Sequence, residues 1–82
     1  MREPAFELRS VAVEPGRRRA FQDAEWRDAI VIVARGEIEL EFLSAGRHRI
    51  TRGEVLWLSG LSLRALHNRG REPAVLVAVS RR

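Results

Sequence analysis

The 82-residue sequence contains no cysteine, no lysine and no tyrosine. The absence of Cys excludes disulfides, thiolate catalysis and thiolate metal sites. With only two His residues, a closed structural zinc site is excluded as well. The absence of Tyr removes one common proton donor of enzyme sites. A chain of this length is expected to form one domain over residues 1–82 and to gain stability from a partner subunit.

The charged residues are numerous but mixed. All 15 basic residues are Arg, and the 11 Asp and Glu residues leave a net charge of +4. The densest basic cluster is Arg17–Arg19, and two more arginines come last, at Arg81 and Arg82. Because the other arginines are spread along the chain and interleaved with acids, the sequence predicts surface ion pairs rather than a basic face for nucleic acid.

Long apolar runs are also missing. The longest, Ala29–Ala34 and Ala74–Val79, are far too short to cross a bilayer. Charged residues interrupt the first residues of the chain, so the apolar core of a signal peptide is not seen there. We therefore expect a cytoplasmic protein with no membrane partner.

Turn signals divide the sequence into short segments of strand composition. Gly, Pro, Ser and Asn recur at Pro15-Gly16, Gly36, Ser44–Gly46, Gly53, Ser59-Gly60, Asn68–Gly70 and Pro73. The runs between them are rich in Val, Ile, Leu, Phe and Trp. This pattern predicts an all-β fold, a small jelly-roll barrel or sandwich of about seven or eight strands.

Three strands have a readable face pattern. Alternation in Glu37–Phe42 puts three Glu side chains on one face, which we expect to be the solvated outer face. The turn Ser44–Arg47 should join this strand to the next in a hairpin. Ala29–Val33 and Ala74–Val79 are almost unbroken apolar, which predicts strands covered on both faces.

Two other segments are less regular. Phe6–Val13 changes phase near Ser10, which predicts an edge strand with a bulge. Gln22–Trp26 is the one helical candidate, but it is short and β-branched residues follow it closely, so we expect no real helix.

The order of these segments resembles the cupin superfamily, the small RmlC-like jelly-roll barrels. Ile30–Glu37 is similar to the end of the first cupin motif, where a strand runs into a glycine, here Gly36. Arg52–Leu58 is similar to the opening of the second motif, which begins at Gly53. The resemblance covers Val13–Val79 and implies a single jelly-roll domain.

The resemblance also indicates which residues stand at the metal-ligand positions of the family, and these residues are not the family's usual ligands. The His of the second motif falls on Arg64, whereas its closing Asn is kept as Asn68. The Glu of the first motif falls on Ala29, or with one slip on Asp28. The paired His residues fall on Gln22 and Ala24, or on Asp23 and Glu25. The resemblance therefore implies a cupin-like barrel without the usual metal site, and we expect no metal cofactor.

The remaining metal-ligating side chains are scattered. Strand alternation puts His67 on the face opposite Arg64, Leu66 and Asn68, and His48 follows the hairpin turn. We expect both to be surface or packed His residues. The acids Asp23, Glu25 and Asp28 are expected to be solvated, with weak binding of a hard cation as the alternative.

Arg64 is the most informative position for function. In a cupin-like barrel it points inward, where its charge needs either a carboxylate such as Asp28 or Glu25, or an anionic ligand. Trp26 and Trp57 are expected either at the same barrel mouth or in the core or a dimer interface. The candidate ligand-binding residues are Arg64, Trp26, Trp57 and Asn68.

These observations predict a small metal-free binding or accessory protein, expected to be a homodimer, that takes an anionic small molecule near Arg64. The alternative is a small enzyme of the cupin type, an isomerase, epimerase or dioxygenase. It would use a non-standard metal site or an acid–base pair such as His67 with a carboxylate.

Overall fold

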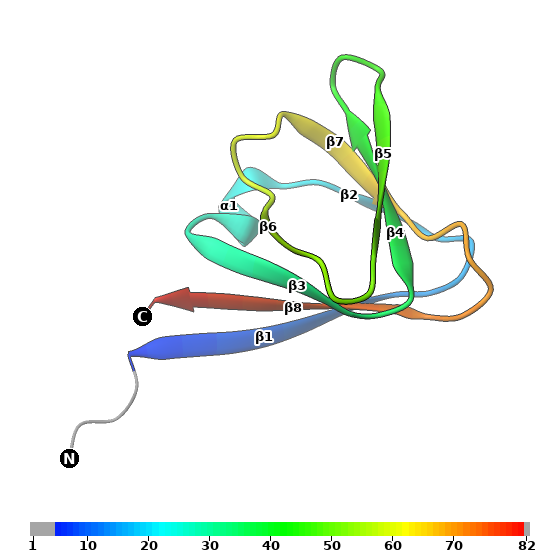
Figure 1. Cartoon of the computed structure of the whole chain (residues 1–82). Coiled ribbons are helices and arrows are strands. Elements are labelled where there is room, and N and C mark those ends of the chain that lie inside the picture. Colours follow the sequence, from blue (N-terminus) through cyan, green and yellow to red (C-terminus); the bar gives the residue numbers. More distant parts are fainter. Residues whose placement is uncertain (1–4, 82) are drawn as a thin grey trace.

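The computed structural model describes residues 5–81, which fold into two four-stranded antiparallel sheets (Figure 1). The predicted domain 1–82 thus includes five residues, 1–4 and Arg82, that lie outside the described part. The strands are β1 (Phe6–Val13), β2 (Arg18–Ala20), β3 (Ala29–Arg35), β4 (Glu37–Phe42), β5 (Arg47–Thr51), β6 (Val55–Trp57), β7 (Leu63–His67) and β8 (Ala74–Arg81). The predicted all-β class is confirmed.

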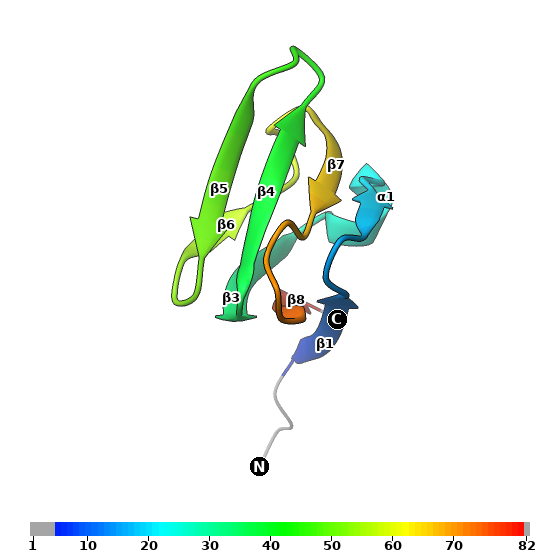
Figure 2. The ribbon, with the colours of Figure 1, turned by 90° about the vertical axis from the view of Figure 1, so that its right-hand side faces the viewer.

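The first sheet has the strand order β1-β8-β3-β6 and the second sheet the order β2-β7-β4-β5. Figure 2 shows the second sheet rising above the first. Neighbours in each sheet are mostly distant in sequence, because the chain crosses between the sheets at almost every turn. The exception is the β4–β5 hairpin, which forms as the Ser44–Arg47 turn predicts.

The core fills the space between the two sheets. Alternate residues of β3 and β8 face inward and are buried, and so are the apolar residues of β4 opposite them. The largest fully buried apolar side chains are Trp26, Ile38, Leu40, Ile50, Leu58, Leu66 and Leu76. Burial of such side chains stabilises the fold by roughly 1.5–3 kcal/mol each.

Gly36 joins the two sheets at the tight β3–β4 connection. Its φ of +72° lies in the left-handed region, and a Cβ there would come within 2.9 Å of the carbonyl oxygen of Pro73. Glycine is required here, because in other residues this φ is strained and the Cβ would clash with the neighbouring backbone. Gly36 is also the glycine at which the sequence resembles the first cupin motif.

The structure corrects the prediction for Gln22–Trp26, where a four-residue helix, α1 (Asp23–Trp26), does form. A backbone hydrogen bond from Glu25 N to Gln22 O, 3.0 Å long, closes the turn. Trp26 is fully buried at its end. Tertiary burial of the indole, rather than helix propensity, stabilises this turn.

The structure also corrects the predicted bulge in β1. β1 is an edge strand, as predicted, but its register with β8 is continuous from Phe6 to Val13. The apolar residues change phase because Phe6 and Leu8 lie on the outer face of the first sheet, whereas Val11 and Val13 face the core. Both faces of this strand therefore carry apolar side chains.

The two strands expected to be covered on both faces are covered on only one by the described chain. In β8, Leu76 is buried against the core, but Val75 and Val77 on the other face stay partly exposed. In β3, Ile30 is 37% exposed. The first sheet thus has an apolar outer face that no described element covers.

No helix among residues 5–81 has the length and apolar character needed to cross a membrane.

Candidate functional site

Among residues 5–81, the residues at the cupin metal positions do not form a group of metal ligands. Ala29 is buried in the core, and Asp28 adopts a positive φ of 58° at the loop that precedes β3. Asp23 is exposed and contacts Arg27 across one helical turn. Within residues 5–81, no three His, Asp or Glu side chains come close enough to hold a metal ion.

Glu25 is already neutralised by two cations from different strands. Arg19 of β2 contacts its carboxylate directly, and Arg9 of β1 lies 3.9 Å from the same oxygen. Arg9 also donates a 2.6 Å hydrogen bond to the backbone oxygen of Glu25 and stacks over the Trp26 ring at 5.3 Å. Glu25 therefore holds α1 against β1 and β2. Its carboxylate is already paired with two arginines and is not free to bind a hard cation.

Arg64 does not point inward as predicted. The pairing of β4 with β7 passes from Glu41 with Ala65 directly to Phe42 with Leu63, so Arg64 is the extra residue of a β-bulge. A bulge breaks the alternation of faces. Half of the Arg64 side chain is exposed, and its Nε lies 3.6 Å from a carboxylate oxygen of Glu41 rather than near Asp28 or Glu25.

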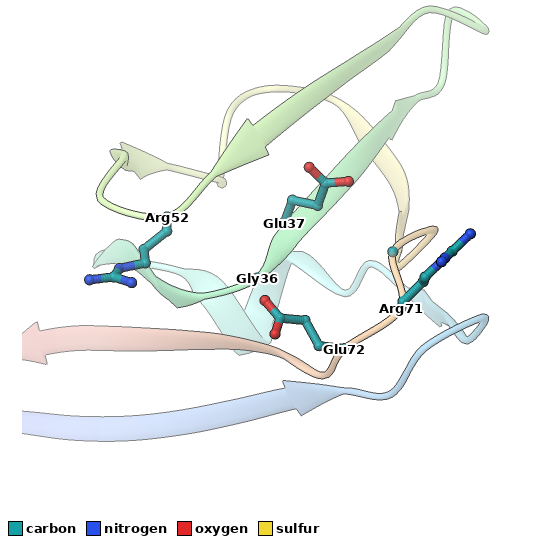
Figure 3. A pocket seen from close by; sticks show the side chains of 6 residues that line it. Gly36, Glu37, Arg52, Arg71 and Glu72 are labelled. Atoms are coloured by element: carbon teal, nitrogen blue, oxygen red, sulfur yellow. The ribbon is translucent and has the colours of Figure 1, made fainter.

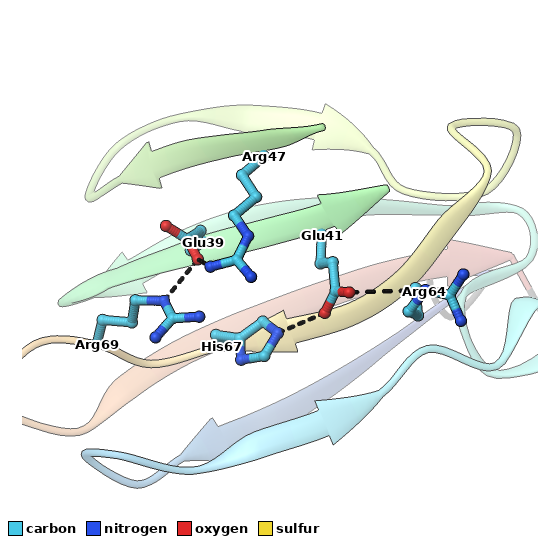
Figure 4. A network of polar contacts seen from close by, with 6 residues as sticks. All are labelled: Glu39, Glu41, Arg47, Arg64, His67 and Arg69. Carbon is cyan, nitrogen blue, oxygen red and sulfur yellow. Dashed lines mark hydrogen bonds and ion pairs between the residues drawn. The ribbon is translucent and has the colours of Figure 1, made fainter. Parts of the chain in front are cut away.

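His67 completes this outer group. Its Nε2 lies 2.7 Å from Oε1 of Glu41, and both side chains are only 15–19% exposed (Figure 4). The prediction that His67 faces away from Leu66 and Asn68 is confirmed, whereas the prediction that it faces away from Arg64 is wrong. The hydrogen bond from His67, opposed in part by desolvation, holds the pKa of Glu41 below its ordinary value.

A second ion-pair group lies beside the first on the same face. Glu39 accepts a 2.6 Å hydrogen bond from Nε of Arg69 and lies 3.3 Å from Arg47. The Arg69 hydrogen bond, again opposed by desolvation, lowers the pKa of Glu39. The three Glu residues of β4 thus share the outer face, as predicted, and arginines from β5 and from the loop after β7 pair with two of them.

Asn68 has a structural environment. It is 1% exposed, and its amide nitrogen donates 2.8 Å hydrogen bonds to the backbone oxygens of Val13 and Glu72. Its side-chain oxygen accepts a 2.9 Å bond from the Gly70 nitrogen. Both hydrogens of the side-chain amide therefore bond to backbone oxygens, and these bonds hold the end of β1 against the loop between β7 and β8.

The two Trp residues do not share one barrel mouth, so the first of the two predicted placements is wrong. Trp26 is fully buried in the core. Trp57 is 52% exposed on β6, at the edge of the first sheet and on its outer face. Its ring lines a hollow of about 610 Å³ together with Phe6, Asp28, Ile30, Val79, Ser80 and Arg81.

A polar hollow of about 280 Å³ lies at the opposite end of the sheets, beside Gly36 (Figure 3). Glu37, Glu72, Arg52 and Arg71 line it. Figure 3 shows Arg52 and Arg71 on opposite sides of the hollow. Because its two cations do not converge and two carboxylates lie between them, this hollow is a poor anion site.

Comparisons with known proteins identify the fold. A cupin domain of an XRE-family transcriptional regulator from Enterobacter cloacae superposes with a TM-score of 0.68 at 19% identity, over 92% of this chain and 79% of that one. A conserved-barrel cupin protein from Salinispora arenicola gives a TM-score of 0.70 at 25% identity, over 93% and 62%. A sugar phosphate isomerase of the cupin superfamily from Silicibacter pomeroyi gives 0.64 at 24%, over 96% and 52%.

The chain therefore has the cupin fold, as the glycine-centred motifs predict. It spans less than two thirds of the length of the second and third of these proteins. No protein-family model and no curated protein sequence matches it.

Two features of the surface escaped the sequence analysis. The pairing of His67 with Glu41 joins residues that are 26 positions apart, and only the strand register reveals it. The uncovered outer face of the first sheet corresponds to apolar residues at consecutive positions of β3 and β8, a pattern that by itself predicts strands covered on both faces.

Proposed function

We propose that this chain is a small metal-free cupin-like accessory module that acts by binding and not by catalysis. The observation that carries the proposal is the filled interior, where Leu40, Leu66 and Leu76 meet between the sheets with almost no exposed surface. A catalytic cupin site would need that space for metal and substrate. A binding partner would therefore meet the surface of the barrel rather than its interior.

The similarity to a cupin domain of a transcriptional regulator supports this role. In that protein a cupin domain accompanies a regulatory function. A compact barrel of this size is suited to the same kind of accessory role, in which it binds a partner protein or a small molecule.

Arg64 remains the residue we propose for an anionic small molecule, now on the outer face of the second sheet. Its guanidinium is half exposed, and Arg18 faces outward from the register position beside His67. A carboxylate or phosphate would have to compete with Glu41 for Arg64. Binding at this site is therefore expected to be weak and salt-sensitive.

The proposal is tested by the metal content of the purified protein. Untagged protein would be analysed by elemental mass spectrometry after dialysis, with a parallel sample incubated with Fe²⁺, Mn²⁺, Zn²⁺ or Ni²⁺. We expect much less than one equivalent of any metal per chain in both samples. Near-stoichiometric metal that survives dialysis would contradict the proposal and put a metal-dependent enzyme in its place.

The second candidate is an enzyme that uses the His67–Glu41 pair for acid–base chemistry. The 2.7 Å contact favours it, since a carboxylate that orients an imidazole is a common catalytic arrangement. The likeness to a sugar phosphate isomerase suggests the substrate class to assay, and Arg64 would face the phosphate. Turnover of a sugar phosphate that disappears in His67→Asn would establish this candidate over the first.

A further inference from the structure

We infer that the hollow beside Trp57 binds a small zwitterion with an apolar body, of the chemical class of the apolar α-amino acids. The hollow has a volume of about 610 Å³ and lies at one end of the outer face of the first sheet. This volume is in the range of small-molecule sites. The inference goes beyond the proposed function, because the hollow lies on a different sheet from Arg64.

The strand order gives the hollow a floor and two sides. Val79 of β8 and Ile30 of β3 lie opposite each other on the two central strands and form the floor. Trp57 lies opposite Ile30 on the edge strand β6. Phe6 lies on the other edge strand, β1, opposite Arg81. Because the bulky rings stand at the edges and smaller aliphatic side chains at the centre, this end of the face is concave.

The apolar part of the hollow suits a flat apolar group. Phe6 and Trp57 keep 53% and 52% of their surface exposed in the chain, so both rings have area left to bury. Burial of apolar area favours binding without a directional requirement. Aromatic rings also prefer offset-stacked or edge-to-face contacts with another ring. A ligand with an aromatic body can make both kinds of contact here.

Two side chains of opposite charge line the same hollow, Asp28 and Arg81. Both are exposed, and neither forms an ion pair with another side chain of residues 5–81. A guanidinium donates two parallel hydrogen bonds to a carboxylate, and a carboxylate accepts hydrogen bonds from an ammonium group. Arg81 therefore suits the carboxylate of an amino acid, and Asp28 suits its ammonium group.

Asp28 and Arg81 do not pair with each other, although they follow the last pair of the β3–β8 ladder. That pair is Ala29 with Ser80, and the next residues outward are Asp28 and Arg81. Asp28 has a φ of 58°, in the left-handed region, so the extended ladder ends before it. Two opposite charges that stay apart beside an apolar floor complement a ligand that carries both charges. A ligand with one charge would leave one of them without a partner.

The acids already paired within the chain provide an internal comparison. Glu25, Glu39 and Glu41 each contact an arginine of the same chain. A ligand at any of these acids would have to displace that arginine. Within residues 5–81, no such partner has to be displaced at Asp28 or Arg81, so a charged ligand gains more there.

The test is isothermal titration calorimetry of the full chain with L-phenylalanine, which carries both charges and an aromatic ring. Two analogues each lack one charge: 3-phenylpropionate has no ammonium group, and phenethylamine has no carboxylate. We expect saturable binding of L-phenylalanine and roughly tenfold weaker binding of each analogue, because each loses one set of charge-assisted hydrogen bonds.

Arg81→Gln and Asp28→Asn each remove one charge from the hollow. Asn adopts a positive φ as readily as Asp, so Asp28→Asn should keep the backbone. Arg81→Gln should weaken binding of L-phenylalanine and 3-phenylpropionate roughly tenfold and leave phenethylamine unaffected. Asp28→Asn should weaken L-phenylalanine and phenethylamine and leave 3-phenylpropionate unaffected. Arg35→Gln, exposed at the opposite end of β3, is the matched control and should bind L-phenylalanine as the wild type does.

Absence of saturable L-phenylalanine binding to the wild type would overturn the inference. Equal affinity for L-phenylalanine in the wild type, Arg81→Gln and Asp28→Asn would overturn it too, and so would binding that Trp57→Ala leaves unchanged. These results are separate from the metal content that tests the proposed function. Protein that retains metal and binds L-phenylalanine contradicts only the proposed function, whereas metal-free protein that does not bind it contradicts only this inference.

Discussion

Trp57 lies directly opposite Ile30 in the antiparallel pairing of β6 with β3, and both side chains project from the outer face of the first sheet. Residues opposite one another in such a ladder have Cβ atoms about 5 Å apart and contact on the same face. Here the contact joins an aromatic and a β-branched side chain in solvent. The pair stabilises the edge of the sheet, and it also lines the hollow that we assign to a zwitterionic ligand.

Replacing Asn68 by Ala should destabilise the fold. The substitution leaves the buried backbone oxygens of Val13 and Glu72 without their donors, which we expect to cost about 2–3 kcal/mol in urea unfolding. Asn68→Asp keeps an acceptor for Gly70 but loses both donors, and it should be at least as damaging. A loss of under about 0.5 kcal/mol for Asn68→Ala would show that its hydrogen bonds do not hold the end of β1 to the β7–β8 loop.

Gly36 and Gly16 form a matched pair for separating backbone strain from packing. Both have a positive φ, but a Cβ at Gly36 meets the Pro73 backbone at 2.9 Å, whereas nothing lies within 4 Å of one at Gly16. Gly16→Ala should therefore cost about 1–2 kcal/mol from strain alone. Gly36→Ala should cost roughly 2–4 kcal/mol because overpacking adds to the strain. Equal losses in urea unfolding would contradict this assignment.

Stability should fall with acid through Glu41 and Glu39, whose pKa values in the folded chain lie below the ordinary value of 4.5. The unfolded chain takes up these protons first as the pH falls, so the stabilisation is present above about pH 4.5 and is lost below it. Urea unfolding of Glu41→Gln should show a weaker loss between about pH 6 and pH 3 than the wild type. Glu14→Gln, at an exposed turn position, is the control, and a variant Glu41→Gln with the full wild-type pH dependence would contradict the prediction.

Arg64→Leu separates a structural role from anion binding. The half-exposed pair with Glu41 should contribute only about 0–1 kcal/mol to stability. If Arg64 binds an anion, phosphate or citrate should raise the melting temperature of the wild type and should do so much less in Arg64→Leu. Arg49→Leu removes another exposed ion pair from the same face and should keep the shift. Equal increases in melting temperature with added anion in all three proteins would contradict anion binding by Arg64.

The local parts of the fold were predictable from the sequence, and the cross-strand parts were not. Alternation in Glu37–Phe42 and the Ser44–Arg47 turn each depend on neighbouring residues, and both predictions are confirmed. The direction of Arg64 depends on a bulge that appears only when β7 pairs with β4, and counting from the second motif could not detect it.

Burial beyond the local sequence explains the other differences. The turn at α1 forms because Trp26 is buried between the sheets, which its weak helical pattern does not indicate. The apolar runs of β3 and β8 led to an expectation of cover on both faces. The core of the chain covers one face, and one end of the other face forms the hollow beside Trp57 that we assign to a ligand.

The most direct test of that central claim uses the absence of tyrosine from the chain, because Trp26 and Trp57 are then the only side chains that emit when indole is excited. Trp26 is fully buried, whereas Trp57 is 52% exposed at the hollow, so only the emission of Trp57 should respond to a ligand there. We predict that saturating L-phenylalanine, which has no indole, shifts the emission of the wild type to shorter wavelength. It should leave the emission of Trp57→Phe unchanged, although that variant keeps an aromatic ring in the hollow. No shift in the wild type, or the same shift in Trp57→Phe, would contradict ligand binding beside Trp57.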